Sequence, residues 1–215
     1  MIETLDKKQQ RASKIYTLLD STYPSGSKCF LYYRAPHELL VASILSKNCS
    51  YKLVNAVSKN LFNKYHSAND FAYCNIESLR EDISNINNHN EKADNINRAC
   101  LDIVQKHNGV LPYSYDDLVL LPGVEHRTGK LLTSEIYNIP TVVIDTHMSR
   151  IMRLLGFTRS NDIKNIEKDI VKVFKENIWL KLTYLVIEHG RSVCNKKKPK
   201  CELCILNRLC PSSSF

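Results

Sequence analysis

The sequence predicts an all-α fold. Apolar residues recur at helical spacing along almost all of the 215 residues. Strand signals are absent apart from the short run 141–144, which is too isolated to build a sheet. The chain has only 6 glycines, so it contains no glycine-rich nucleotide loop. With 43% hydrophobic residues, it can bury a core as one domain or as two small ones.

Individual helices are predicted from residues that start or stop a helix and from apolar spacing. Pro36 favours the first turn of a helix that continues over 37–47. Ser50 and Asn90 are candidate N-caps of two later helices, and Gly109 is a candidate stop. The other expected elements are an apolar face made by Ile15, Leu18 and Leu19, and helices over 128–137, 146–155, 166–174 and 178–193.

Four cysteines near the C-terminus have the spacing C-x6-C-x2-C-x5-C and indicate a metal centre: Cys194, Cys201, Cys204 and Cys210. A structural zinc site usually has two short cysteine pairs, whereas only Cys201 and Cys204 are close here. The spacing therefore fits a [4Fe-4S] cluster better than one ion, because the four irons occupy a larger body. A disulfide knot is the alternative. The remaining cysteines are expected to be buried free thiols: Cys29, Cys49, Cys74 and Cys100.

The N-terminal segment and the hydropathy predict a soluble intracellular protein. The opening MIETLDKKQQ is too polar for a signal peptide. No apolar run approaches the length that crosses a membrane. We therefore expect no membrane partner, and a cytoplasmic, nucleoid-associated location if the source is bacterial.

The charge of the chain favours an anionic partner. The formal net charge is +8, and about +6 remains after four thiolates bind a cluster core of roughly 2+. Lysines concentrate between the first two cysteines of the motif, in the segment NKKKPK, as Lys196, Lys197, Lys198 and Lys200. A loop fixed at both ends by a cluster would present these lysines to phosphates without reading sequence. A solvated loop with no partner is the alternative.

The segment 121–129, LPGVEHRTG, predicts a helix–hairpin–helix. An apolar helix runs into a Pro-Gly turn, and a second helix follows at once. Backbone N–H groups at the turn and at the start of the second helix can bind a phosphate. The residues expected to meet it are Gly123, Val124, Glu125 and His126. A plain connection between two helices is the alternative.

Asp145 precedes a predicted helix and follows the apolar pair Val143 and Ile144. Its simplest role is that of an N-cap. The helix dipole there favours the ionised carboxylate, which could also stabilise positive charge on a sugar or activate water. Both roles can belong to one residue.

The ordered motifs resemble the endonuclease III family of base-excision DNA glycosylases. The hairpin is followed by the sequence IDTH around Asp145, and later by EHGRSVC, which leads into the cysteine motif. Upstream, PHELLVASILS at 36–46 is similar to the first core helix of the family, and the resemblance covers roughly residues 10–210. Three ordered motifs and a cysteine spacing are more specific together than any one alone.

This resemblance implies a two-lobed helical fold and a partner. A six-helix barrel with the hairpin would span 29–137, and a second lobe would join 1–28 to 138–215 and hold the [4Fe-4S] cluster. A monomer would bind double-stranded DNA that contains a damaged base or an abasic site in the groove between the lobes. The damaged base, an oxidised pyrimidine by family default, would be flipped out of the duplex.

The sequence departs from the family pattern L-P-G-V-G-[RK]-K-T at the lysine that attacks the sugar. The matching residue is Arg127, and a protonated guanidinium has no lone pair for imine formation. Arg127 could still hold a phosphate or the leaving base. Other amines are Lys130, about 4.5 Å deeper along the same helix, and Lys47 near the expected DNA-facing loop.

Glu125 stands where the pattern has its second glycine. A carboxylate roughly 5 Å from a phosphate costs about 3 kcal/mol at an effective dielectric constant near 20. We expect Glu125 either to cap its own helix or to be offset by His126 and Arg127. In both cases the hairpin would bind DNA more weakly than its relatives do.

Two further positions match residues that fill the space left by a flipped base. Family members have Gln or Asn where Asn48 stands, and a wedge that is commonly apolar where Asn88 stands. A polar wedge gains less from insertion between bases. A plain loop between helices is the alternative reading of this Asn-rich run.

Three functions are consistent with these residues. The first is a monofunctional glycosylase in which Asp145 is the catalytic carboxylate. The second is a bifunctional glycosylase and lyase that uses another amine. The third is a non-catalytic iron–sulfur protein that binds DNA.

Overall fold

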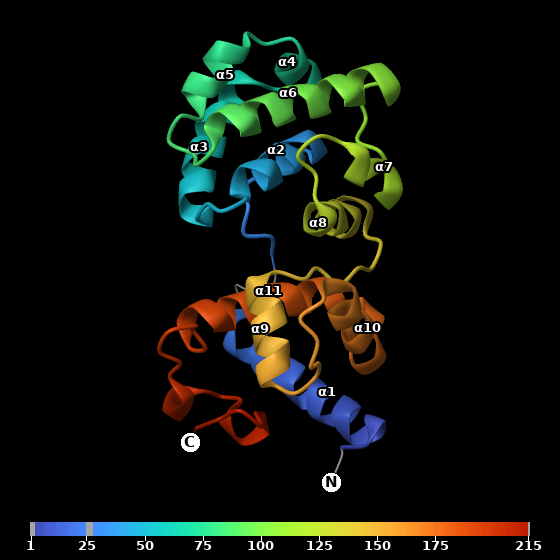
Figure 1. Ribbon diagram of the computed structural model, residues 1–215, viewed down its shortest axis with the longest axis vertical. Coiled ribbons are helices and arrows are strands. Elements are labelled where there is room, and N and C mark those ends of the chain that lie inside the picture. Colours follow the sequence, from blue (N-terminus) through green and yellow to red (C-terminus); the bar gives the residue numbers. More distant parts are fainter. Residues whose placement is uncertain (1–2, 25–27, 215) are drawn as a thin grey trace. The chain divides into compact units, whose positions relative to one another are not determined.

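The computed structural model describes residues 3–24 and 28–214, and these residues form helices and no strand, which confirms the all-α prediction (Figure 1). The run 141–144 has no regular secondary structure, and the described part of the chain contains no strand. The chain divides into two compact units, which we call the continuous unit, Phe30–Ile139, and the discontinuous unit, Met1–Cys29 with Pro140–Phe215. In the described ranges, no helix has the length and apolar character needed to cross a membrane.

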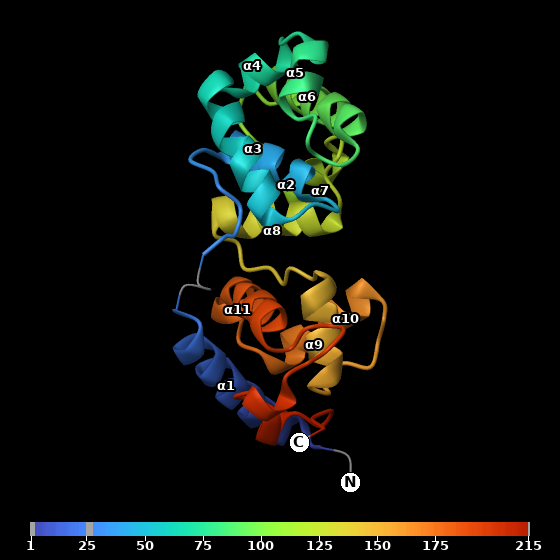
Figure 2. The same ribbon diagram turned by 90° about the vertical axis from the view of Figure 1, so that its left-hand side faces the viewer.

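The continuous unit is built around a helix that is buried on all sides. Residues Glu38 to Ser46 of α2 are all buried, as expected for a helix whose sequence is apolar all round. It packs against α3, α6 and α8 (Figures 1 and 2). The helices of this unit are α2 (Pro36–Ser46), α3 (Tyr51–Lys64), α4 (Ala68–Ala72), α5 (Ile76–Asp82), α6 (His89–Lys106), α7 (Tyr115–Leu120) and α8 (His126–Tyr137).

The discontinuous unit joins the N-terminal helix to the C-terminal part of the chain. Its core combines apolar residues of α1, α9, α10 and α11, and three of the C-terminal cysteines pack against it. α9 lies on α11, which also contacts α1 (Figure 1). Its helices are α1 (Leu5–Thr22), α9 (Thr146–Leu154), α10 (Ile163–Val173) and α11 (Trp179–Ser192), with short 3-10 turns η2 (Glu176–Ile178), η3 (Cys201–Leu203) and η4 (Asn207–Leu209).

Most predicted helix signals are confirmed, and two are wrong. Pro36 occupies the first turn of α2, and Ser50 caps α3 by accepting from the backbone N–H of Leu53 at 3.3 Å. Asn90 is not a cap, because α6 begins one residue earlier, at His89. Leu18 is 36% exposed rather than part of the buried face of α1.

The prediction that four scattered cysteines are buried holds for one of them. Cys100 is buried, and burial raises the pKa of its thiol to about 12. Cys29, Cys49 and Cys74 are only partly buried. These three lie in segments between helices, where the helical spacing used to predict their burial does not apply.

Candidate functional site

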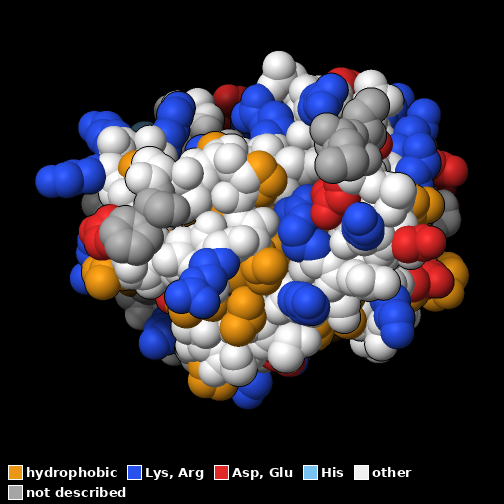
Figure 3. Space-filling view, turned by 90° about the horizontal axis from the view of Figure 1, so that it is seen from below, with side chains coloured by type: hydrophobic (Ala, Val, Ile, Leu, Met, Phe, Trp, Pro, Cys, Tyr) orange, Lys and Arg blue, Asp and Glu red, His pale blue; other side chains and the backbone are white. Residues whose placement is uncertain are grey.

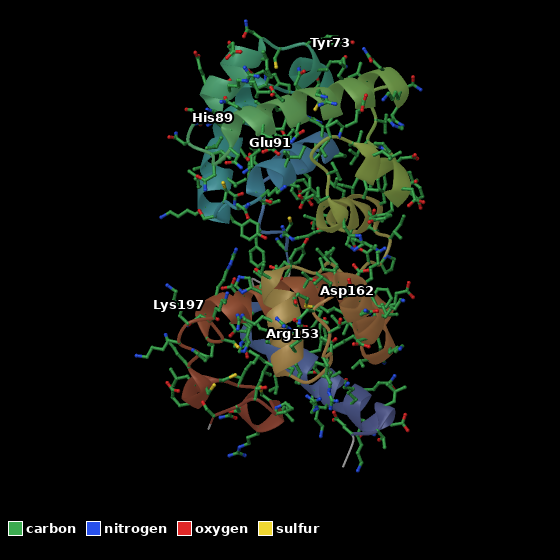
Figure 4. The ribbon with its side chains drawn as sticks, in the orientation of Figure 1. Tyr73, His89, Glu91, Arg153, Asp162 and Lys197 are labelled. Carbon is green, nitrogen blue, oxygen red and sulfur yellow. The ribbon has the colours of Figure 1, made fainter. Side chains whose placement is uncertain are left out.

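A polar pocket of about 310 Å³ lies within the continuous unit. It lies where the loop after α2, the start of α6 and the hairpin turn meet. Three residues predicted to meet DNA line it together, namely Asn48, Asn88 and Gly123. The sequence did not predict the other lining residues as part of a site, except for Lys47, which was a candidate amine. These residues are Ile44, Lys47, Asn87, Glu91, Lys92 and Asn95. Glu91 extends from the first turn of α6 (Figure 4).

Both predicted wedge residues have left-handed backbones. Asn48 and Asn88 each have a φ of 55°, a conformation that asparagine tolerates better than most residues. The Asn87 side chain donates to the carbonyl of Asn48 at 3.2 Å, so the two loops are tied together. Asn88 is the N-cap residue of α6, but its side chain makes no capping bond.

The hairpin turn requires glycine at position 123. Gly123 has a φ of 78°, and an added Cβ would lie 2.9 Å from the Cβ of Asn95. Only glycine lets the turn pack this closely against α6. The side chain of Val124 is buried, so a phosphate could meet that residue only through its backbone.

Glu125 forms an ion pair with Lys47, which was not predicted from the sequence. Its carboxylate accepts from the Lys47 ammonium at 2.5 Å. It makes no side-chain capping bond, while His126 contacts the Tyr115 hydroxyl. The expectation that Glu125 caps its own helix is therefore wrong, and the offset by His126 and Arg127 stays a prediction. The hydrogen bond to Glu125 raises the pKa of Lys47, so this amine is held protonated.

Arg127 projects from the first turn of α8, and one of its Nη atoms donates to the Tyr51 hydroxyl at 2.7 Å. Tyr51 stacks on Phe30 with ring centroids 5.7 Å apart. The guanidinium is thus oriented by an aromatic residue of α3. The ammonium of Lys130 lies 5.0 Å from the centroid of the Tyr115 ring, a cation–π contact on the hairpin helices.

Lys92 is a buried cation at the edge of the pocket, and its side chain links two elements. Its ammonium donates to the carbonyls of Leu45 and Lys47 at 2.9 and 2.6 Å, and lies 3.5 Å from the Cys49 sulfur. These carbonyls lie at the C-terminal end of α2, where the helix dipole favours a positive charge. The signal was present in the sequence, because Lys92 falls on the apolar face formed by Ala93, Ile96, Ala99, Cys100 and Ile103.

In the discontinuous unit, Asp145 is the N-cap of α9. Its carboxylate accepts from the backbone N–H of Met148 at 2.7 Å, which confirms the capping prediction. The preceding segment is fixed from the other side, because the Thr183 hydroxyl donates to the carbonyl of Val143 at 3.1 Å. The carboxylate is half-buried and has a defined orientation.

The four C-terminal cysteines line one apolar cavity of about 80 Å³. All four thiols are free. Within the described ranges, no three Cys, His, Asp or Glu side chains converge as ligands of a single ion. Burial raises the pKa of the Cys204 and Cys210 thiols, so these sulfurs favour the protonated form unless a metal binds them. Four sulfurs around a shared cavity fit a polynuclear cluster better than one tetrahedral ion.

Two cationic or polar side chains face the sulfurs. One Nη of Arg150 lies 3.6 Å from the Cys194 sulfur, and the other donates to the Cys194 carbonyl at 2.6 Å. His189 lies 3.6 Å from the Cys204 sulfur through Nε2. Burial, with a smaller contribution from the charge of the nearby Arg150, lowers the pKa of His189 to about 4. This imidazole is therefore neutral near pH 7.

The lysine loop after α11 is exposed and ordered by its own backbone. The backbone N–H of Lys198 donates to Asn195 Oδ1 at 2.8 Å, and that of Lys200 to the carbonyl of Val193 at 3.1 Å. Lys197 points outward from this loop (Figure 4). On the face drawn in Figure 3, Lys and Arg side chains are scattered among apolar ones rather than gathered in one patch. On this face, charge alone does not mark a binding surface.

Comparison with known proteins gives the family. Residues 41–176 match the HhH-GPD superfamily of base excision DNA repair proteins, a range that contains the hairpin and Asp145. Endonuclease III of Synechocystis sp. is 37% identical over 214 residues, which cover 99% of this chain and 97% of that protein. The chain belongs to the endonuclease III family. It is an endonuclease III-type base excision DNA glycosylase.

Other members of the endonuclease III family agree with this assignment. Endonuclease III of Bacillus subtilis is 34% identical over 185 residues, 86% of this chain and 84% of that one. The solved structure of a non-covalent endonuclease III–DNA complex is 34% identical and matches with a TM-score of 0.87 over 94% of this chain and 96% of that chain. A thermostable thymine-DNA glycosylase shares the fold, with a TM-score of 0.86 at 18% identity over 98% of this chain and 99% of that chain.

Replacing Lys92 by Met should destabilise the protein by about 1–3 kcal/mol. Met fills similar volume but leaves the carbonyls of Leu45 and Lys47 without their charged donor. The free energy lost with these two charge-assisted hydrogen bonds exceeds the free energy gained by removing a buried charge, because two carbonyl oxygens and the Cys49 sulfur surround the ammonium. Urea unfolding measures the change. Lys106→Met, on the exposed face of the same helix, should stay within about 0.5 kcal/mol of the parent; equal stability of both variants would contradict the role of Lys92.

Proposed function

We propose that this endonuclease III-type enzyme is a monofunctional DNA glycosylase that releases a damaged base and leaves an abasic site. One observation carries the proposal: Arg127 occupies the position at which the family pattern has its nucleophilic lysine, and its guanidinium is bound to the Tyr51 hydroxyl. A guanidinium remains protonated and cannot form an imine with the sugar. The substrate class we propose is duplex DNA with an oxidised pyrimidine.

Asp145 is the proposed catalytic carboxylate. As the glycosidic bond breaks, the base leaves with the bonding electron pair and the sugar develops positive charge at C1′. The carboxylate stabilises that charge, and it accepts a proton from the water that attacks C1′. The bond to Met148 N–H and the fixed segment before Asp145 support this role, because they orient the carboxylate without a lysine.

The pocket of the continuous unit is the proposed site where the protein holds distorted DNA. Asn48 and Asn88 would enter the space left by the flipped base, and the first-turn N–H groups of α8 would bind a phosphate, as in helix N-terminal anion sites. Gly123, Val124, Glu125 and His126 would contribute through the backbone of the hairpin. The exposed lysines of the loop after α11 would add phosphate contacts: Lys196, Lys197, Lys198 and Lys200.

A [4Fe-4S] cluster bound by Cys194, Cys201, Cys204 and Cys210 is the proposed cofactor. The support is the shared apolar cavity, the free thiols and the charged and polar groups that face two of the sulfurs. When bound, the cluster would cross-link the C-terminal segment to the end of α11 and fix both ends of the lysine loop. We also propose that the two units are the two lobes of the family fold and that the enzyme acts as a monomer.

The alternative of a lyase that uses another amine is weakened by the contacts of both candidates. Lys47 is held as an ammonium by Glu125, and Lys130 lies against the Tyr115 ring. A non-catalytic module is disfavoured by membership in a family of enzymes.

Single-turnover assays test the reaction type. Duplexes with thymine glycol, dihydrouracil or uracil should yield strand breaks only after alkali or heat has cut the abasic product. Asp145→Asn, which keeps a capping oxygen, should lower the rate of base release by about 10²- to 10⁴-fold. The matched variant Asp162→Asn, at the N-cap of α10, should keep the parent rate. Base release by Asp145→Asn at the parent rate would contradict the catalytic role proposed for Asp145.

Restoring an amine at position 127 should create lyase activity. Arg127→Lys should form an imine with an abasic site, because lysine supplies the missing lone pair. Borohydride should then trap a covalent complex with abasic DNA, whereas the parent and Arg127→Gln should give none. A trapped complex with the parent would instead mean that another amine already performs this step.

Removing the charge of Glu125 should strengthen DNA binding. Glu125→Gln frees Lys47 for a phosphate and removes a repulsive carboxylate; because both side chains are largely exposed, we expect a gain of about 1 kcal/mol, or about fivefold in Kd. Fluorescence anisotropy with an undamaged duplex measures it. Glu81→Gln, an exposed carboxylate on α5, changes the net charge equally and should change Kd by less than about twofold. No difference between the two variants would contradict a role for Glu125 at the DNA surface.

A further inference from the structure

His189 lies between the end of α1 and the cysteine cavity, and it contacts both. It is 2% exposed. Its Nδ1 lies 2.9 Å from the Tyr23 hydroxyl, and its Nε2 lies 3.6 Å from the Cys204 sulfur. Tyr23 is the residue that ends α1, and its backbone N–H donates to the carbonyl of Leu19. A continuous line of polar atoms therefore connects the N-terminal helix to one sulfur of the cavity.

The direction of these hydrogen bonds follows from the chemistry of the sulfur. A thiolate that binds iron offers lone pairs and no hydrogen, so the ring nitrogen that faces it must carry the N–H. In a neutral imidazole, the other nitrogen then accepts, and Nδ1 takes its hydrogen bond from the Tyr23 hydroxyl. Ser192, one turn after His189 on α11, lies 3.1 Å from the same hydroxyl and helps to fix its position.

We propose that Tyr23 and His189 form a relay that donates a hydrogen bond to the Cys204 sulfur and thereby raises the reduction potential of the iron–sulfur centre. Both are positioning residues, because neither belongs to the residues proposed to contact DNA or the reacting sugar. The inference rests on the cluster assigned under the proposed function. Hydrogen bonds to cluster sulfurs and to the groups behind them tune the potential, since they stabilise the more negative, reduced state.

The sulfurs of Cys194 and Cys204 each face a hydrogen-bond donor, but the two donors are oriented in different ways. Arg150 faces the Cys194 sulfur as a permanent cation, and its orientation is fixed by the Cys194 carbonyl. Cys204 faces an imidazole that can place its hydrogen on either nitrogen. Because the Tyr23 hydroxyl accepts from Ser192, its own hydrogen is directed at Nδ1, which favours the tautomer with hydrogen on Nε2. The Tyr23 hydroxyl oxygen contacts neither sulfur nor iron. Removing it should nevertheless change the reduction potential of the iron–sulfur centre.

The test uses Tyr23→Phe in the full-length holoprotein. Phe keeps the ring that packs edge-on against His189 at a centroid distance of 5.8 Å and removes only the hydroxyl. Iron and acid-labile sulfide per chain should equal those of the parent. The reduction potential, measured by protein-film voltammetry, should move in the negative direction. The matched control is Tyr16→Phe, which removes a hydroxyl beside Lys181 two turns earlier in α1 and should leave the potential unchanged.

A second pair of variants shows whether the hydroxyl acts through the imidazole. In His189→Gln, the amide N–H can donate to the sulfur without help from Tyr23. The effect of Tyr23→Phe on the potential should therefore disappear in the His189→Gln background. This comparison also decides the matter if Tyr23→Phe alone loads the centre poorly.

Three results would overturn the relay. An unchanged potential in a fully loaded Tyr23→Phe protein would do so, as would an equal shift in Tyr16→Phe or an undiminished shift in the His189→Gln background. A parent protein without iron and sulfide would overturn both the relay and the cofactor assignment. Base release by such a protein would still leave the proposed glycosylase reaction standing, so the two failures are distinguishable.

Discussion

The hydrogen bonds from the buried Lys92 ammonium to the end of α2 are the interaction on which the pocket of the continuous unit depends. They place a positive charge where the helix leaves unpaired carbonyls, and the burial of the lysine makes them hard to replace by water. The loop that follows α2 carries Asn48, and the residue that supplies the ammonium lies four positions after Asn88. One side chain thus sets the distance between the two loops proposed to enter DNA.

The hairpin next to this pocket combines a favourable backbone with an unfavourable charge. Gly123 allows the turn to pack on α6, so the first N–H groups of α8 are presented as in other anion-binding helix starts. Glu125 opposes this function, and the ion pair with Lys47 reduces its charge without removing it. Because exposed ion pairs contribute little, a phosphate can compete for Lys47 at small cost. In the proposed function, non-specific affinity for DNA is then limited, and more of the binding energy would come from contacts made after the base is flipped.

Most local signals were read correctly from the sequence, and interactions between distant segments were not. The caps at Ser50 and Asp145 could be predicted because the side chain bonds an N–H only three residues away. Lys47 and Glu125 are separated by 78 positions, and Arg127 and Tyr51 by 76. Such pairs depend on how helices pack, which apolar spacing alone does not determine. The cysteine motif predicted one metal centre because its four members lie within a short segment, whereas the contacts of its sulfurs with His189 and Arg150 required the fold.

The proposed monofunctional reaction rests on the contacts of Arg127, the residue that stands where the family pattern has its lysine. Imine chemistry needs an unprotonated amine that moves freely onto C1′, whereas the guanidinium is charged and bound to the Tyr51 hydroxyl. Hydrolysis needs only a carboxylate held near the developing positive charge and a water molecule. Asp145 meets the first requirement through its helix cap, which is a local interaction within the discontinuous unit. The carboxylate is therefore positioned independently of the residue at 127, so in the proposed reaction an arginine there would abolish the lyase step and leave base release intact.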